Sequence, residues 1–519
     1  PQGVLRDAWP RLLSDDAVGL RRLARLVDQR LRDKRGIVNH TAIAPVIKLL
    51  LDDVTPWRSG KYIEDLLRDW LQAHVVAETP AGHPLRVLLR ERLMEACAAG
   101  DRRLAQERQA AVTTSQADKE PQMRREELGF LMRLLSAFRR LFAWVVDPDA
   151  RSPERVKTDR HSAGSHSHRF VEIGCGSRPR RQRPAVPREI KDAIVLELLA
   201  LLGPDLGSDG EAILCRVARD APSWLAPAVE ELFTGRALAS FGCGLLARLT
   251  AAYYLDDESG GFRHDNDGIR RHRARSFGIF PQFGYLRGPF MSLLQTDFGN
   301  GVSVLNRLLN HAARIRVRTL TRLGPAGHPF HDGLGYETEL EIAGTRRRYI
   351  GDGNVWRWYR GTAVGPYPCM SALQALERVC DQLIKIDIPI RTVIAILLRD
   401  CENIAMVGLV VGLLVRHLEI TGGVLDAYLA EPVIWHHEFT RITHEMSGLA
   451  ADSEGLVNPD RRKWSLREAA GCMVLRADER RAAELRAVGE MLVANARRDI
   501  ESASDESVTD LVAREEDDS

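Results

Sequence analysis

The chain has 519 residues, of which 45% are hydrophobic and 28% charged, and its formal net charge is +2. This composition is typical of a folded globular protein, and the length excludes one ordinary core, because such chains form several domains or an extended array. The small net charge excludes a chain-wide electrostatic attraction to nucleic acid.

Cysteines and apolar runs bear on the cellular compartment. The eight cysteines are scattered without a Cys-x-x-Cys pair, which favours a reduced, cytoplasmic protein. No basic segment followed by an apolar core marks a secretory signal at the start. The longest apolar run, residues 404–415, is shorter than the roughly 20 residues that cross a bilayer. We therefore predict a buried helix there and no membrane contact. Because the chain opens with Pro1 rather than Met, it is expected to belong to a longer protein.

Helical periodicity dominates the first part of the chain. Apolar residues recur at helical spacing over residues 20–31, 43–51, 63–76 and 128–146, which predicts an N-terminal helical region at 1–146. Residues 147–188 are predicted to be a basic flexible linker. From Arg151 to Arg188 the chain has ten Arg or Lys residues against three acidic ones, with Ser, Gly and Pro interspersed.

The remainder is predicted to be a helical array interrupted by strands. Helical patterns cover 189–313, with a loop at 256–275, and return over 353–500. Between them, residues 314–320 alternate with period two and 337–350 are typical of a hairpin, so 314–352 is predicted as a small β insertion. Residues 501–519, with eight acidic residues and one arginine, are predicted to be a disordered acidic tail. The predicted fold is mainly α, an α-solenoid-like array with a small antiparallel β insertion.

The strongest local signature is Gly-Asp-Gly-Asn-Val-Trp-Arg-Trp-Tyr-Arg-Gly at residues 351–361. One interpretation is a buried plug, in which the rings fill the seam between the β insertion and the next helices while the arginines pair with carboxylates. The other is a contact site for a ligand or partner. Its residues would be Trp356, Arg357, Trp358, Tyr359 and Arg360, with Asn310 and His311 as supporting neighbours.

Catalytic patterns are sparse. A P-loop requires Gly-x-x-x-x-Gly-Lys-Ser/Thr after a strand, and the nearest sequence, residues 58–62, lacks the first glycine and the hydroxyl. His437 and His444 are seven residues apart, whereas a zincin helix needs histidines four apart, so no metal site is predicted. The alternative to a non-catalytic role is a metal-dependent nuclease or hydrolase whose carboxylates are Asp265, Asp267 and Asp352. Acidic residues in such loops are more often turn formers.

Arginines also allow a nucleic-acid-binding module. The segment from Arg151 to Arg188, the loop from Arg270 to Arg275 and the arginines at 314–318 and 346–348 would supply the positive surface, and the aromatic rings of 356–359 would stack on bases. The chain's small net charge counts against this.

Several segments together resemble a known class of protein. They are Tyr-Leu-Arg-Gly-Pro-Phe at 285–290, Asn-Arg-Leu-Leu-Asn-His-Ala-Ala at 306–313, Trp-Arg-Trp-Tyr-Arg-Gly at 356–361, Gly-Pro-Tyr-Pro at 365–368, Ser-Ala-Leu-Gln-Ala-Leu-Glu at 371–377 and Cys-Glu-Asn-Ile-Ala-Met-Val-Gly at 401–408. Residues 280–440 resemble the helical region of very large bacterial STAND-like or AAA-like P-loop ATPases, several of which act in anti-phage defence. The resemblance implies that ATP and magnesium bind in an upstream domain and that this chain holds no cofactor. It also implies that the helical array senses a protein or ligand, or mediates self-assembly.

Overall fold

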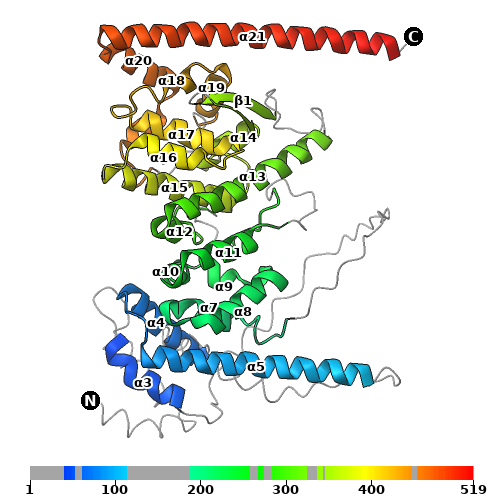
Figure 1. Ribbon diagram of the computed structural model, residues 1–519, viewed down its shortest axis with the longest axis vertical. Helices are drawn as coiled ribbons and strands as arrows, with labels where there is room; N and C mark the ends of the chain where they lie inside the picture. The colour runs from blue at the N-terminus through cyan, green and yellow to red at the C-terminus, as the bar shows by residue number, and fades with distance from the viewer. Residues whose placement is uncertain are drawn as a thin grey trace, which may run out of the picture. The chain divides into compact units, whose positions relative to one another are not determined.

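The computed structural model describes residues 40–52, 61–113, 186–256, 267–273, 283–323, 336–342, 345–445 and 453–517. These residues are mostly helical, with one two-stranded antiparallel sheet (Figure 1). The predicted class, mainly α with a small antiparallel β element, is confirmed, and a regular solenoid repeat stays a prediction. The chain divides into two compact units, residues 1–224 and 225–519.

Unit 1 is all-helical in the part that the structure describes. Its elements are α3 (His40–Asp52), α4 (Lys61–Val76), α5 (Pro84–Thr113), α7 (Ala193–Leu201), η2 (Gly203–Asp205), α8 (Gly207–Asp220) and η3 (Pro222–Trp224). The predicted helices at 43–51 and 63–76 are thus confirmed. Helices α7 and α8 pack with α4 and α5, so the division falls at Trp224 rather than at the predicted boundary near residue 188.

The core of unit 1 contains both apolar and polar side chains. Trp70 of α4 is fully buried, because apolar residues at helical spacing turn one face of α4 toward α3 and α7. Arg86 of α5 forms a buried ion pair with Asp205 of η2, with 2.7 Å between Nε and Oδ2. Asp205 Oδ1 also accepts a 2.6 Å bond from the amide of Gly82. The paired charges therefore fix the start of α5 to the turn after α7.

Unit 2 is a succession of helices with the sheet inserted. Its elements are α9 (Ala226–Val229), α10 (Leu232–Phe241), α11 (Cys243–Tyr254), α12 (Phe290–Thr296), α13 (Phe298–Leu323), β1 (Glu337–Ile342), β2 (Thr345–Ile350), α14 (Gly353–Trp356), η5 (Arg357–Arg360), α15 (Tyr367–Lys385), α16 (Ile390–Leu398), α17 (Ile404–Arg416), α18 (Asp426–Leu429), α19 (Pro432–Glu445), η6 (Pro459–Lys463), α20 (Leu466–Arg476) and α21 (Glu479–Asp517). In Figure 1, α9 to α12 lie at the lower end of unit 2, α15 to α17 in its middle, and α20 and α21 at its upper end.

Helix α17 is the apolar centre of unit 2. Its residues are buried almost without exception, as the apolar run at 404–415 predicts, and it contacts α14, η5, α15, α16 and η6. Asn403 begins it as the N-cap, because its side-chain oxygen accepts a 2.9 Å bond from the amide of Met406. No helix among the described residues is both long and apolar enough to cross a membrane.

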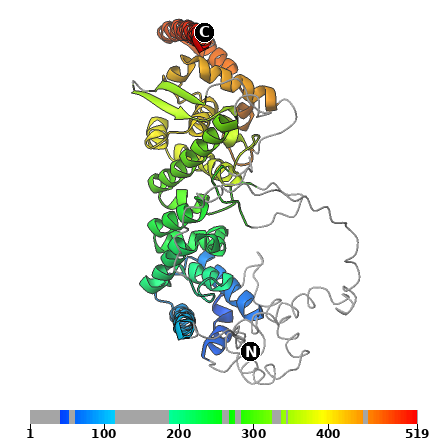
Figure 2. The same ribbon diagram turned by 90° about the vertical axis from the view of Figure 1, so that its right-hand side faces the viewer.

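The sheet is a single hairpin. Strands β1 and β2 pair antiparallel, with Glu337 opposite Ile350 and Ile342 opposite Thr345, which confirms the predicted hairpin. It packs against α13 through β2 and against α18 through β1. Figure 2 shows the two green strands at the edge of unit 2. The buried side chains of the hairpin are Thr338, Leu340 and Tyr349. Arg346 and Arg348 are exposed and pair with Glu339 and Glu337 across the hairpin.

Two predicted segments are wrong. Residues 314–320 are helical within α13 and form no strand. Their alternation also fits a helix, because Ala313, Arg316 and Leu320 are buried at three- and four-residue spacing. The acidic end predicted to be disordered is helical to Asp517 within α21, and no Gly or Pro after Gly489 interrupts it. The predicted helices at 20–31 and 128–146 lie outside the described residues.

Candidate functional site

The signature segment forms the turn that links β2 to α15. We call residues 356–360 the aromatic-arginine turn; it comprises the end of α14 and all of η5. Asp352 caps α14, accepting a 2.9 Å bond from the amide of Val355. Gly351 precedes it with φ 142°, where an added Cβ would lie 2.7 Å from Val355 and 2.8 Å from Ile404. Only glycine fits this strained and crowded position.

The rings of the turn are packed inside unit 2. Trp356, Trp358 and Tyr359 are at most 1% exposed. The Trp356 ring stacks on His437, with centroids 5.0 Å apart and planes inclined by 9°. Its Nε1 donates to Glu438 Oε1 at 3.0 Å, so the ring's single polar atom is satisfied. The packing matches the plug interpretation, and in this conformation no ring offers a face to a nucleic acid base.

Two glycines of α17 make room for the turn. A Cβ added to Gly408 would lie 2.7 Å from the carbonyl oxygen of Trp356, and one added to Gly412 would lie 2.9 Å from the Tyr359 ring. Glycines four residues apart share one helix face. The turn therefore sits directly on the backbone of α17, closer than side-chain packing would allow.

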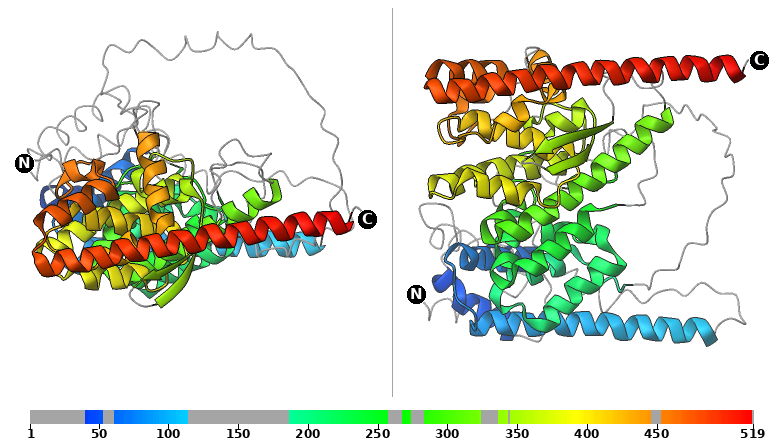
Figure 3. Two further views of the ribbon diagram at one scale, coloured as in Figure 1. Left: turned by 90° about the horizontal axis from the view of Figure 1, so that it is seen from above. Right: turned by 45° about the horizontal axis from the view of Figure 1, so that its top comes forward.

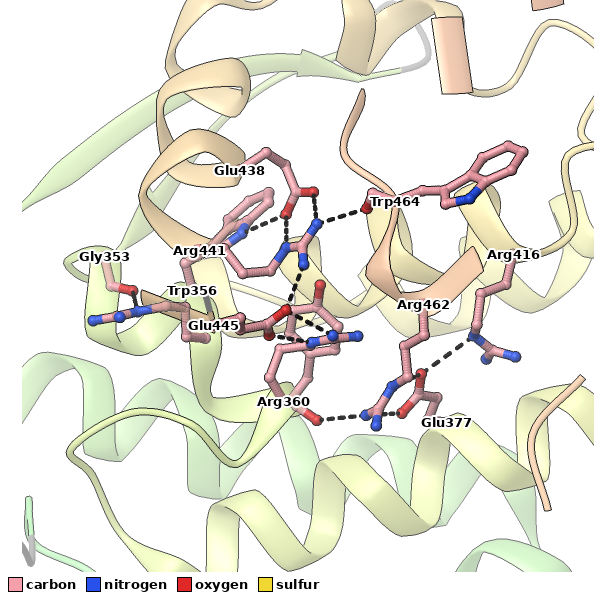
Figure 4. A network of polar contacts seen from close by, with 12 residues as sticks. Gly353, Trp356, Arg360, Glu377, Arg416, Glu438, Arg441, Glu445, Arg462 and Trp464 are labelled. Atoms are coloured by element: carbon pink, nitrogen blue, oxygen red, sulfur yellow. Dashed lines mark hydrogen bonds and ion pairs between the residues drawn. The ribbon is translucent and has the colours of Figure 1, made fainter. Parts of the chain in front are cut away.

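One arginine of the turn, Arg360, takes part in a group of largely buried ion pairs. Arg360 donates to both oxygens of Glu445 at 2.6 and 2.8 Å. Arg441 donates to Glu438 at 2.9 and 2.8 Å, to Glu445 at 2.8 Å and to the carbonyl of Trp464 at 2.7 Å (Figure 4). Burial alone would raise the pKa of Glu445, but the bonds from Arg360 and Arg441 hold it below its ordinary value. This half of the assembly joins η5, α19 and the start of α20.

A second half joins α15, α17 and η6. Arg462 donates to Glu377 at 2.7 and 3.2 Å and to the carbonyl of Tyr359 at 3.4 Å. Arg416 lies 3.3 Å from Glu377 and 2.7 Å from Asp381, which also bonds His417 at 2.8 Å. Against the effect of burial, the bonds from His417 and Arg416 keep the pKa of Asp381 below its ordinary value.

Together these residues form what we call the ion network. It comprises Arg360, Arg416, Arg441 and Arg462 with Glu377, Asp381, Glu438 and Glu445. Four guanidinium groups thus face four carboxylates, and the charges balance. Such a network places each charge beside an opposite one and fixes the helices that carry them. It leaves little charge with which to attract a ligand.

The remaining predicted contact residues take structural positions. Arg357 donates to the carbonyl of Gly353 at 3.0 Å and to Asn354 Oδ1 at 2.9 Å. Asn310 on α13 accepts from the amide of Glu402 at 3.0 Å and from Asn403 Nδ2 at 2.7 Å. It therefore fixes the start of α17.

The alternative catalytic carboxylates are brought together in part. Asp265 lies outside the described residues. Arg316 binds Asp352 bidentately at 3.0 and 2.9 Å, and its Nη1 is 3.5 Å from Asp267 Oδ2. Burial raises the pKa of Asp267 to about 7, whereas Arg316 outweighs burial and lowers that of Asp352. A guanidinium thus occupies the place between the carboxylates where nuclease chemistry would require a metal ion.

His311 supports the same corner from α13. A Cβ added to Gly268, which has φ 72°, would lie 2.6 Å from His311 Nε2. Gly268 therefore lets the segment 267–273 approach α13 closely. Among the described residues, no group of three or more His, Cys, Asp or Glu side chains is placed to hold a metal ion.

Many of the arginines suggested for nucleic acid are paired within the chain. Arg314 pairs with Glu402, Arg346 with Glu339 and Arg348 with Glu337. Arg270 donates to the carbonyl of Tyr253 at 2.7 Å and lies 3.3 Å from Asp256. The segment from Arg151 to residue 185 and Arg275 lie outside the described residues. Nucleic-acid binding stays a prediction.

One hydrogen-bonded chain was not predicted from the sequence. His272 Nε2 lies 3.3 Å from Ser371 Oγ, and its Nδ1 lies 3.1 Å from the hydroxyl of Tyr254. A serine beside a histidine is the pattern of a nucleophile and its base. However, Ser371 is fully buried and accepts a 3.2 Å bond from the amide of Gly284. Burial lowers the pKa of His272 to about 3, so the imidazole is neutral. Its two hydrogen bonds connect the segment 267–273 to α11 and α15. No sequence signal links residues about a hundred positions apart.

A cavity opens at the turn between α15 and α16. Its volume is about 270 Å³, and it is lined by Ile384, Asp387, Ile388, Pro389, Ile390, Arg391 and Ile420. The lining combines apolar side chains with one acidic and one basic residue.

Comparison with known proteins adds no relative. No protein-family model matches the chain, and no curated protein matches it. The resemblance to the helical region of bacterial P-loop ATPases therefore stays a prediction.

Proposed function

We propose that this chain is a non-catalytic recognition and scaffold region of a larger bacterial ATP-dependent protein of the defence type. In this role it senses a protein or ligand and mediates assembly, while ATP and magnesium are bound by an upstream domain. The observation that carries the scaffold role is the ion network. Its balanced charges are buried and join five elements of unit 2.

Buried ion pairs hold the elements of unit 2 in fixed relative positions. A bidentate arginine–carboxylate pair fixes both distance and orientation, and breaking a buried pair leaves an uncompensated charge. Elements connected by several such pairs move together rather than independently. The aromatic-arginine turn is thereby a rigid joint between the hairpin and the helices that follow it. A rigid framework is what a region needs when it presents surfaces to a partner.

The catalytic alternative receives less support from the geometry. Asp352 and Asp267 share Arg316, so neither carboxylate is free for general acid or base work. The proposed upstream nucleotide site rests on the sequence resemblance alone.

Nucleotide assays test the proposal directly. We expect the purified chain to show no saturable binding of ATP with magnesium and no hydrolysis of ATP above the buffer rate. As a control, a chain extended to include the upstream region is expected to turn over ATP if that region carries a P-loop. ATP turnover by this chain that a single substitution within it abolishes would overturn the proposal.

A further inference from the structure

The cavity at the turn between α15 and α16 combines an apolar lining with two exposed charges. Five of its lining residues are apolar, four of them isoleucines, and the other two are Asp387 and Arg391. The lining residue Ile420 is 52% exposed, so apolar surface is open to solvent here. Both charged residues are exposed as well. In the right-hand view of Figure 3, α15 to α17, in yellow-green to yellow, lie between α12 in green and α21 in orange and red.

The two charges of the lining are not used to hold the chain together. Within the described part of the chain, the side chains of Asp387 and Arg391 make no hydrogen bond or ion pair, either with each other or with a third residue. A Cβ added to Gly422 would lie 3.9 Å from Arg391 Nη2, so the guanidinium lies near the turn after α17. The carboxylate belongs instead to the turn after α15. One cavity therefore offers a separate acidic and basic group, as a ligand carrying both charges requires.

The backbone at Asp387 is strained. Its φ is 65°, a left-handed conformation that disfavours residues with a Cβ. The amide of Asp387 donates to the carbonyl of Ile384 at 3.1 Å, and that of Ile388 donates to the carbonyl of Leu383 at 3.1 Å. This is the Schellman ending of a helix, in which glycine is the usual residue. An acidic side chain thus stands where glycine would be more stable, and strain of this kind is typical of ligand sites.

We propose that this cavity binds a free apolar α-amino acid of about the size of leucine. Arg391 donates to both oxygens of its carboxylate, and the carboxylate of Asp387 accepts from its ammonium group. The apolar side chain enters among the isoleucines, where its surface leaves water. The volume of about 270 Å³ is just below the roughly 300–1,000 Å³ of sites for drug-sized ligands, which fits an amino acid better than a nucleotide.

The combination of charges favours an amino acid over other apolar ligands. A fatty acid would pair with Arg391 and leave Asp387 without a partner, and an apolar amine would do the reverse. A protein segment would need a charged side chain of each sign beside the apolar one, whereas a free amino acid carries all three groups around one carbon. The inference gives the proposed sensing role a class of ligand, and it rests on that role for its meaning.

Isothermal titration calorimetry of the full chain tests the class of ligand. With L-leucine, L-isoleucine, L-valine, L-methionine and L-phenylalanine titrated in turn, we expect at least one to bind saturably, with a dissociation constant between about 10 μM and 1 mM. Two control ligands should bind at least about tenfold more weakly. N-acetyl-L-leucinamide keeps the side chain and removes both charges, whereas glycine keeps both charges and removes the side chain. Equal binding of either control, or no saturable binding of any of the five, would overturn the inference.

Substitutions in the lining test which groups bind the amino acid. Asp387→Asn removes the charge and keeps a residue that tolerates the left-handed backbone, and Arg391→Gln removes the guanidinium. Each is expected to raise the dissociation constant at least about tenfold. Arg399→Gln, an exposed arginine at the other end of α16 and outside the lining, is the matched control and should leave it unchanged. Binding that survives both lining substitutions would place the ligand elsewhere and overturn the inference.

Asp387→Gly separates ligand binding from a structural role. Glycine relieves the backbone at the end of α15, so this variant should unfold at a higher urea concentration than the unmodified chain while it loses the amino acid. Unchanged binding in the stabilised variant would show that the carboxylate has no part in the site and would refute the assignment. None of these measurements involves ATP turnover, so failure here is distinguishable from failure of the proposed function.

Discussion

Three glycine-to-alanine substitutions in unit 2 test whether the aromatic-arginine turn sits on the backbone of α17. Gly408 and Gly412 of α17 face the turn, whereas Gly471 of α20 has no atom within 4 Å of a Cβ added there. All three are inside helices, so each substitution gains the same helical propensity, about 1 kcal/mol. The differences among them therefore report only what the new methyl group meets.

The structure sets the order of the three effects. At Gly471 the methyl meets solvent, and we expect stabilisation by about 0.5–1 kcal/mol. At Gly408 it would lie 2.7 Å from the carbonyl oxygen of Trp356, a main-chain atom that cannot rotate away. Overpacking costs about 1–3 kcal/mol, and moving this carbonyl also disturbs the Trp356–Glu438 bond. We expect a net destabilisation of about 1–2 kcal/mol. Gly412→Ala meets the Tyr359 ring at 2.9 Å and should fall between.

Native-state hydrogen exchange is the assay, because it reports unit 2 without requiring the two units to unfold together. The slowest amides of α17 give the free energy of unfolding of its surroundings, and those of α20 give the local value for Gly471→Ala. Urea unfolding followed by tryptophan fluorescence provides an independent ranking. If Gly408→Ala is as stable as the unmodified chain, the close approach of turn and helix is wrong. Equal effects at Gly408 and Gly471 would refute it as well.

Charge and pH provide three more predictions. Arg441→Met leaves two carboxylates without their shared arginine and should lower the free energy of unfolding in urea by about 3–5 kcal/mol. Arg480→Met, where the arginine side chain is 90% exposed, is the control and should change this free energy by less than about 0.5 kcal/mol. Similar losses in the two variants would contradict the role of the ion network. The pKa of Asp267 rises on folding from 3.8 to about 7, so its contribution to the stability of unit 2 is present at low pH and is lost as the pH rises toward 7. Asp267→Asn should therefore flatten that decline, and an unchanged slope between pH 4 and 8 would disprove the assignment. Burial, reinforced by His40, Arg86 and His83, lowers the pKa of His74 on folding from 6.5 to about 3, so unit 1 should lose stability as the pH falls below about 6.5. His74→Phe should reduce this loss when the hydrogen exchange of the α4 amides is followed from pH 7 to 4.

Local patterns in the sequence were sufficient for most of the helices. The helical pattern predicted over 353–500 includes α16, and the apolar run at 404–415 lies within α17, because a buried helix repeats its apolar residues over a short stretch. Residues 314–320 show the limit of this reasoning. The period-two pattern treats every arginine in this segment as exposed. Arg316, however, is buried, because its side chain bonds Asp352.

The carboxylates that pair with the arginines of the signature could not be predicted from the sequence. The general expectation that they pair with carboxylates is confirmed for Arg360. Which carboxylate it meets depends on α19, 85 residues away, and nothing local specifies that choice. The same holds for Arg462 and Glu377. Conversely, Asp267 and Asp352 were proposed to lie close together, and they do. Arg316 lies between them and pairs with both carboxylates, so their proximity serves the packing of unit 2.

The sequence separation within the ion network has a kinetic consequence. Its pairs connect residues mostly 35 to 85 positions apart, as in Arg416–Asp381 and Arg360–Glu445, so they close only after several helices have docked. Interactions that form after the transition state chiefly slow unfolding. We therefore expect the ion network to lower the unfolding rate of unit 2 more than it raises the folding rate.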